Sequence, residues 1–159
     1  MRRALVLLCC LLLGACWQVK EPLVTQGVRA EGLEDGIYRR DDGTEVALRW
    51  NAAEGRYDIG TTGGSARIAP LGGGLWMVDY ADAVRMVLLA SVENGTVAFR
   101  APTMEAETRL AKANGLALKP GPVRCLSGSP AAMKTFAAAV AALEGTPELV
   151  VADRLTRVR

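Results

Sequence analysis

The sequence contains no histidine among its 159 residues. Histidine is the usual base beside serine and cysteine nucleophiles and the commonest zinc ligand, so these kinds of site are not expected. Aromatic residues are also scarce: there are three Trp, three Tyr and two Phe. Since alanine supplies much of the apolar content, we expect one domain with a core of small side chains.

Clusters of basic residues are absent as well. The formal net charge of +2 comes from Arg2 and Arg3, because the 17 other basic side chains balance 17 acidic ones. The longest basic run after residue 15 is the pair Arg39 and Arg40. A balanced chain without basic clusters is not expected to concentrate nucleic acid or anionic lipid. We therefore predict no nucleic-acid partner.

The apolar run at the amino terminus is too short to cross a membrane. Residues 4–15 carry no charge and follow two arginines. As a helix this run would extend about 18 Å, against a hydrocarbon core of about 30 Å. A positive start followed by a short apolar run is typical of a signal peptide.

Leu13, Gly14, Ala15 and Cys16 end this run. They resemble the lipobox of bacterial lipoproteins, in which a leucine stands three residues before the cysteine and small residues lie between them. The resemblance implies that a signal peptidase recognises Leu13, Gly14 and Ala15 and cleaves after Ala15. It also implies a diacylglyceryl group on the Cys16 sulfur and an acyl group such as palmitate on the new amine. Two or three acyl chains anchor a protein stably.

Two other interpretations of the amino terminus stay open, namely an ordinary secretory peptide cleaved near Gly14 and an uncleaved anchor. Trp17 stands where enterobacterial lipoproteins of the inner membrane carry aspartate. The resemblance therefore favours the periplasmic face of the outer membrane, with the inner membrane as the alternative. One interpretation of Trp17 is that its ring lies at the level of the lipid headgroups.

The chain divides into three parts by its pattern. We expect a signal peptide over residues 1–15, a lipidated amino terminus and tether over 16–33, and a single domain over 34–159. The tether is predicted because its residues mix polar side chains with proline and glycine and show no sustained period.

From residue 36 to residue 101, short runs of alternating apolar and polar residues are separated by turn residues. This pattern predicts an antiparallel meander of six to seven strands. Val46, Leu48 and Trp50 fall on one face of one strand, and Asn94-Gly95 is a strong hairpin signal.

After residue 102 the pattern becomes helical. Thr103 caps a predicted helix over 104–114, and Ser129 with Pro130 begins a second, which Gly145 ends. A short strand or a packed turn is expected over 149–152 and a surface segment over 154–159. The predicted class is α+β: a curled sheet or partial barrel with two short helices in the C-terminal third.

Cys125 is the only cysteine left after lipidation of Cys16 and loss of residues 1–15. It could be a small buried residue, pair with another chain, or act as a nucleophile whose base would be Lys119 or a carboxylate. We favour the buried residue.

Two groups of aspartates could be carboxylate pairs for acid/base chemistry or calcium binding. Asp41 and Asp42 precede a glycine, which is typical of a hairpin turn, and Asp79 and Asp82 lie where a strand is expected to end. Neither spacing matches an EF-hand loop. The run Gly72–Gly74 precedes a strand and has no following Gly-Lys-Ser/Thr, so it predicts a loop rather than a phosphate site.

Trp50, Tyr57 and Trp76 could line a concave site for a small apolar ligand, although their alternation favours a sheet core. No residue pattern points to a cofactor or a metal. We expect a membrane-anchored binding or interaction module of the cell envelope that is not an enzyme. Its partner would be an envelope protein or a small apolar ligand. The alternatives are a small hydrolase or thiol enzyme using Cys125 or an Asp pair, and a purely structural envelope protein.

Overall fold

The computed structural model describes residues 17–60, 63–119 and 124–158. The predicted lipobox, Leu13 to Cys16, lies outside these residues. The strands are β1 (Trp17–Gln18), β2 (Gly36–Arg40), β3 (Glu45–Asn51), β4 (Arg56–Ile59), β5 (Gly64–Gly72), β6 (Leu75–Ala81), β7 (Arg85–Glu93), β8 (Thr96–Pro102), β9 (Ala117–Lys119), β10 (Arg124–Ser127) and β11 (Leu149–Arg157). The helices are α2 (Met104–Ala113) and α3 (Pro130–Ala141).

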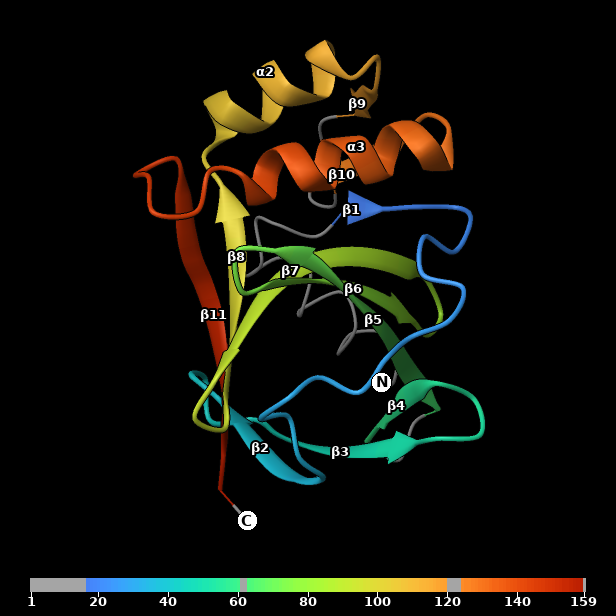
Figure 1. The fold of residues 1–159 in the computed structure, drawn as a ribbon, viewed down its shortest axis with the longest axis vertical. Coiled ribbons are helices and arrows are strands. Elements are labelled where there is room, and N and C mark those ends of the chain that lie inside the picture. Colours follow the sequence, from blue (N-terminus) through green and yellow to red (C-terminus); the bar gives the residue numbers. More distant parts are fainter. Residues whose placement is uncertain (1–16, 61–62, 120–123, 159) are drawn as a thin grey trace.

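Eight of the strands close into an antiparallel barrel. The hydrogen-bonded order is β6-β5-β4-β3-β2-β11-β8-β7, and β7 pairs back onto β6. Closure leaves these strands no free edge, which removes a surface that could pair with other chains. Figure 1 shows the barrel below the two helices, with the C-terminus at the opposite end.

The barrel interior is filled by alternate residues of its strands. Each of the eight strands contributes to one apolar cluster, because side chains on a strand point alternately to the two faces of the sheet. The fully buried members include Tyr38, Tyr57 and Ala90, and Trp50 and Trp76 pack against them. The inward face of β3 is the predicted Val46, Leu48 and Trp50 face.

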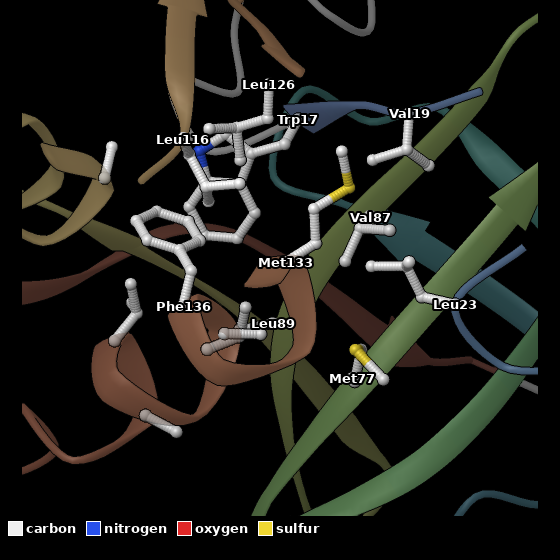
Figure 2. Close-up of a cluster of buried hydrophobic side chains, with 14 of the residues drawn as sticks. Trp17, Val19, Leu23, Met77, Val87, Leu89, Leu116, Leu126, Met133 and Phe136 are labelled. Atoms are coloured by element: carbon white, nitrogen blue, oxygen red, sulfur yellow. The ribbon is translucent and has the colours of Figure 1, made fainter. Parts of the chain in front are cut away.

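A second apolar layer lies outside the barrel, under what we call the cap: α2, α3, β1, β9 and β10 with their connecting loops. β1 lies between β7 and β10, and β10 pairs with β9. Figure 2 shows Trp17, Leu126 and Phe136 of the cap packed beside Leu89 of β7. One face of β6 and β7 thus packs into the barrel interior, and the other packs against the cap.

The predicted class is confirmed, but the sheet is larger than predicted. The described residues form eleven strands rather than six or seven, and the barrel is closed rather than partial. Closure depends on β11, which pairs with β2 on one side and β8 on the other. Residues 154–157 belong to this strand, whereas we had expected a surface segment from residue 154. The alternation there is interrupted by a register shift between Val151 and Asp153, which concealed the strand's full length.

The segment expected as a tether is folded onto the domain. Trp17, Val19, Leu23, Val24, Ala30 and Leu33 are all less than 8% exposed. In Figure 1 the segment runs from β1, beneath the helices, along the barrel to β2 at the opposite end. It has no sustained period because it buries single side chains in pockets of other elements rather than forming a regular element of its own.

Within the described residues, no helix is long and apolar enough to span a membrane.

Candidate functional site

The first described residue, Trp17, is locked into the cap. Its indole Nε1 donates a hydrogen bond to Glu107 Oε1 of α2 at 2.6 Å, and both residues are at most 1% exposed. Its ring meets Phe136 of α3 edge-on, with 5.0 Å between ring centroids. An edge-to-face pair and a satisfied indole N–H make this a specific contact rather than a merely apolar one. Trp17 is thus part of the core, and its ring is not placed for contact with lipid headgroups.

The next residue, Gln18, joins β1 to β10 on the sheet face opposite to Trp17. Gln18 lies opposite Cys125 of β10, and the Cys125 thiol donates to Gln18 Oε1 at 3.1 Å. Cys125 in turn lies opposite Lys119 of β9. Cross-strand neighbours project to the same face of a sheet. Gln18, Cys125 and Lys119 therefore form a row on the side facing away from Trp17.

The segment after β1 is held by a buried carboxylate. Asp79 of β6 accepts hydrogen bonds from the amides of Leu23 and Val24 through Oδ2, at 2.6 and 3.0 Å. Its other oxygen pairs with Arg85 Nη1 at 2.5 Å, and the Asp79 side chain is 0% exposed. Three donors therefore satisfy a charge that would otherwise be costly to bury. Asp79 clamps the amino-terminal segment to the barrel wall.

The same segment closes the end of the barrel remote from the helices. The Tyr57 hydroxyl accepts from the Ala30 amide and donates to the Leu33 carbonyl, both at 3.2 Å. Burial raises the pKa of Tyr57 above its ordinary value of 10.0, and the hydrogen bond from Ala30 partly opposes this shift. The Ala30 amide and the Leu33 carbonyl thus both have partners where the segment enters the barrel end.

A close backbone approach explains one glycine of this segment. The Gly27 amide donates to the Gly55 carbonyl at 3.2 Å. A Cβ on Gly27 would lie 2.5 Å from that oxygen and 3.0 Å from the Ile68 nitrogen. Only a residue without a side chain allows the two backbones to meet here.

The three aromatic residues proposed as a ligand pocket do lie together. Trp50, Tyr57 and Trp76 belong to the cluster inside the barrel, and the rings of Trp50 and Tyr57 are 4.9 Å apart. Two surface cavities lie among the described residues, and none of the three aromatic residues lines either of them. In this structure they fill the barrel with one another.

The larger of these cavities lies at the barrel end remote from the cap. It has a volume of about 620 Å³ and is lined by Gly32, Glu34, Asn94, Gly95, Arg157 and Val158. Arg157 pairs with Glu34 at 2.5 Å and donates to the Asp35 carbonyl at 3.0 Å. The cavity is open and polar, and its volume is within the range of ligand pockets.

The aspartates for which carboxylate pairs were the alternative to turns have separate partners. Asp79 faces the amino-terminal segment, whereas exposed Asp82 accepts only a weak hydrogen bond from Tyr80 at 3.4 Å. Asp42 Oδ1 accepts from the Thr44 amide at 2.8 Å, which lowers the pKa of Asp42 and stabilises the predicted hairpin turn. Across the described parts of the chain, no group of three or more Cys, Asp or Glu side chains is placed to hold a metal ion.

The other turn predictions are confirmed. Gly72 ends β5, and Gly73 and Gly74 connect it to β6; all three have positive φ, which favours glycine. Asn94 and Gly95 form the two-residue turn between β7 and β8, with φ of 48° and 73°.

Sequence reasoning missed Trp17, Glu107 and the clamp role of Asp79. Glu107 lies in the first turn of α2, where the helix dipole already favours an acidic residue, so its position in the sequence indicates no tertiary partner. Its burial depends on a tryptophan 90 positions away in the sequence. Only the run of apolar residues at 17, 19, 23 and 24 could have indicated that the segment packs.

Comparison of the chain with protein families, with curated proteins and with solved structures found no match.

Proposed function

We propose that this protein is a lipid-anchored protein of the bacterial envelope, held through Cys16, whose barrel serves as a binding or interaction module. The observation that carries the proposal is the lipobox-like Leu13-Gly14-Ala15-Cys16 placed directly before Trp17, the first described residue, which is buried. Consecutive Cα atoms are about 3.8 Å apart. A lipid on Cys16 would thus join the cap itself.

The fold supports this arrangement because it fixes the anchor relative to the rest of the molecule. Trp17 is held by Glu107 and Phe136, and the following segment by Asp79. A domain joined this closely would keep its cap beside the bilayer. The opposite end of the barrel would then face away from the membrane.

That outward end carries the cavity beside Asn94 and Arg157. Its lining includes a guanidinium, a carboxylate and a side-chain amide, so it suits a polar group of a partner better than an apolar ligand. We propose an envelope protein as the partner at this end. A lipoprotein without Asp after the cysteine would belong to the periplasmic face of the outer membrane.

Two experiments test this function. Detergent phase partitioning should place the wild type in the detergent phase, and Cys16→Ala should leave it as an unprocessed precursor or move it to the aqueous phase. Mass spectrometry of the amino-terminal peptide should find the lipid on Cys16. Wild type recovered from the aqueous phase with an unmodified Cys16 contradicts the anchor.

The partner is tested by crosslinking in intact cells. A photo-crosslinking residue at Asn94 should capture one recurring protein, whereas the same residue at Ala53, exposed in the β3–β4 turn, should not. Equal capture at both positions, or none, contradicts a partner at the cavity. Density-gradient separation of the two membranes then tests the outer-membrane assignment.

A further inference from the structure

The strand β1 is paired along both of its edges. Trp17 and Gln18 lie antiparallel to β7 on one side and parallel to β10 on the other. The Val19 amide extends the contact with β7 by donating a hydrogen bond to the Arg85 carbonyl at 3.1 Å. A strand held on both sides has no free edge with which another chain could pair. The backbone of β1 is therefore closed to an external partner in the folded protein.

The side chains of this short strand are held as firmly as its backbone. Trp17 is 1% exposed and donates to Glu107, and Figure 2 shows its ring beside Phe136. Val19, just after β1, belongs to the same apolar cluster and is 5% exposed. Lifting β1 out of the cap would expose both side chains and break the bond to Glu107. The undocked state is consequently rare in the folded protein.

The Asp79 clamp adds a restraint just beyond β1. The amides of Leu23 and Val24 donate to Asp79 Oδ2 at 2.6 and 3.0 Å. Only residues 19–22 lie between Gln18 and Leu23. Because each residue extends the chain by at most about 3.6 Å, this short connection limits how far β1 can move from the barrel.

Under the proposed anchor, the bond that is cleaved lies directly beside this strand. It joins Ala15 to Cys16, and Cys16 is followed by Trp17. A peptidase that cleaves there has to hold the backbone on both sides of the bond in its active site. On the carboxyl side this backbone is Cys16 and Trp17, and Trp17 is paired with β7 and β10. The docked strand and the peptidase therefore need the same residues.

Resting on the proposed lipid anchor, we infer that docking of β1 closes the processing site, so that the signal peptidase cleaves the Ala15–Cys16 bond only while β1 is undocked. Hydrolysis of this bond consumes one water and leaves a carboxylate on Ala15 and an amine on Cys16. Cleavage and folding of the cap compete for Trp17. A chain whose cap folds first remains a lipid-modified precursor, and its cleavage rate is set by the opening of β1.

The test uses the full-length precursor with the diacylglyceryl group on Cys16, collected from cells in which the signal peptidase is inhibited. The folded precursor is mixed with purified peptidase in detergent, and mass spectrometry follows the loss of residues 1–15. The matched variant has a flexible spacer of about ten Gly and Ser residues between Cys16 and Trp17, which leaves Leu13 to Cys16 unchanged. We expect the spacer precursor to be cleaved about tenfold faster or more, because opening of β1 no longer limits access.

A second variant changes the docking without touching the residues that the peptidase recognises. Glu107→Leu removes the acceptor of the Trp17 indole and should raise the cleavage rate about fivefold or more. In the spacer precursor the same substitution should leave the rate unchanged. The matched control is Glu105→Leu, which removes the same charge from an exposed position of α2 and should change neither rate. Circular dichroism checks that the variants are folded, and the spacer comparison decides alone if Glu107→Leu is not.

The outcomes separate the inference from the proposed function. Equal cleavage of the wild-type and spacer precursors overturns the inference and leaves the anchor in place. A faster rate with Glu107→Leu in the spacer precursor also overturns it, because the effect then does not act through docking. If Cys16 carries the lipid but neither precursor is cleaved, the processing site itself is wrong. If mass spectrometry finds no lipid on Cys16, the proposed anchor fails, and the inference that rests on it fails too.

Discussion

Trp17 donates its indole N–H to the carboxylate of Glu107 at 2.6 Å, and neither side chain is accessible to solvent beyond 1%. This contact joins the first described residue to α2. It makes the amino-terminal segment a structural part of the domain, so a lipid attached just before it would be attached to the fold. Glu107 also has contacts beyond this bond.

The hydrogen bond between Trp17 and Glu107 should stabilise the folded protein. Glu107→Leu removes the acceptor and leaves the buried indole N–H unsatisfied, which we expect to lower the free energy of unfolding by about 1 to 3 kcal/mol. Glu107→Gln keeps an oxygen acceptor of the same shape and should lose less. Urea unfolding of the three proteins measures this, and equal losses in both variants would show that the acceptor is unimportant.

The Asp79 clamp should hold residues 17–24 to the barrel. Asp79→Ala leaves Arg85 and two amides without their partner, so we expect a loss of about 3 kcal/mol in the free energy of unfolding. The segment should also loosen, and trypsin should cleave after exposed Lys20 faster than in the wild type. The matched control is Asp82→Ala, an exposed carboxylate of the next turn, which should change stability by less than about 0.5 kcal/mol.

Phe136 should be a principal contact between α3 and the rest of the core. It is 1% exposed and meets Trp17 edge-on. Phe136→Ala should cost about 3 to 5 kcal/mol because it leaves a cavity beside the indole. Thr135→Ala, on the exposed face of the same helix, should cost under about 0.5 kcal/mol. Thermal or urea unfolding distinguishes them, and similar losses in the two variants would contradict the assignment.

The backbone contact at Gly27 predicts a steric effect. Gly27→Ala places a Cβ 2.5 Å from the Gly55 carbonyl oxygen and 3.0 Å from the Ile68 nitrogen. Both are backbone atoms, which cannot rotate away as a side chain could. We expect a destabilisation of about 1 to 3 kcal/mol. Thr25→Ala, at an exposed position of the same segment, should be close to neutral. A neutral Gly27→Ala variant in urea unfolding would mean that the segment moves freely from the barrel.

Stability should fall at alkaline pH. Burial is the main cause that raises the pKa of Tyr57 and of Tyr38 above 10.0 in the folded protein. A raised folded-state pKa means that the stabilisation is fully present below pH 10 and is lost as the pH rises through the folded-state value. Urea unfolding from pH 8 to 11 should show this decrease.

Tyr57→Phe should lower the free energy of unfolding at pH 8 by about 1 kcal/mol, since two hydrogen bonds are lost. It should also make the decrease in stability between pH 8 and 11 smaller than in the wild type. An unchanged pH slope in that variant contradicts the role of Tyr57.

Much of the local structure could be predicted from the sequence. The Thr103 and Ser129 caps accept from the amides of Ala106 and Ala132, at 3.3 and 3.1 Å, as the cap preferences indicate. The Asn94-Gly95 hairpin and the inward face of β3 follow from backbone preferences and period-two alternation. Such features depend on residues within a few positions of one another, where propensity and spacing are informative.

The amino-acid sequence by itself determined the strands of the meander, the two helices with their caps, the hairpin turns and the lipobox-like run that ends at Cys16. Only the tertiary structure decided that β11 closes the barrel and that residues 17–33 pack against it. These features depend on contacts such as Trp17 with Glu107 and Asp79 with Leu23. Their partners are 90 and 56 positions apart, so no local pattern encodes the pairing, and it forms because buried polar groups must find partners.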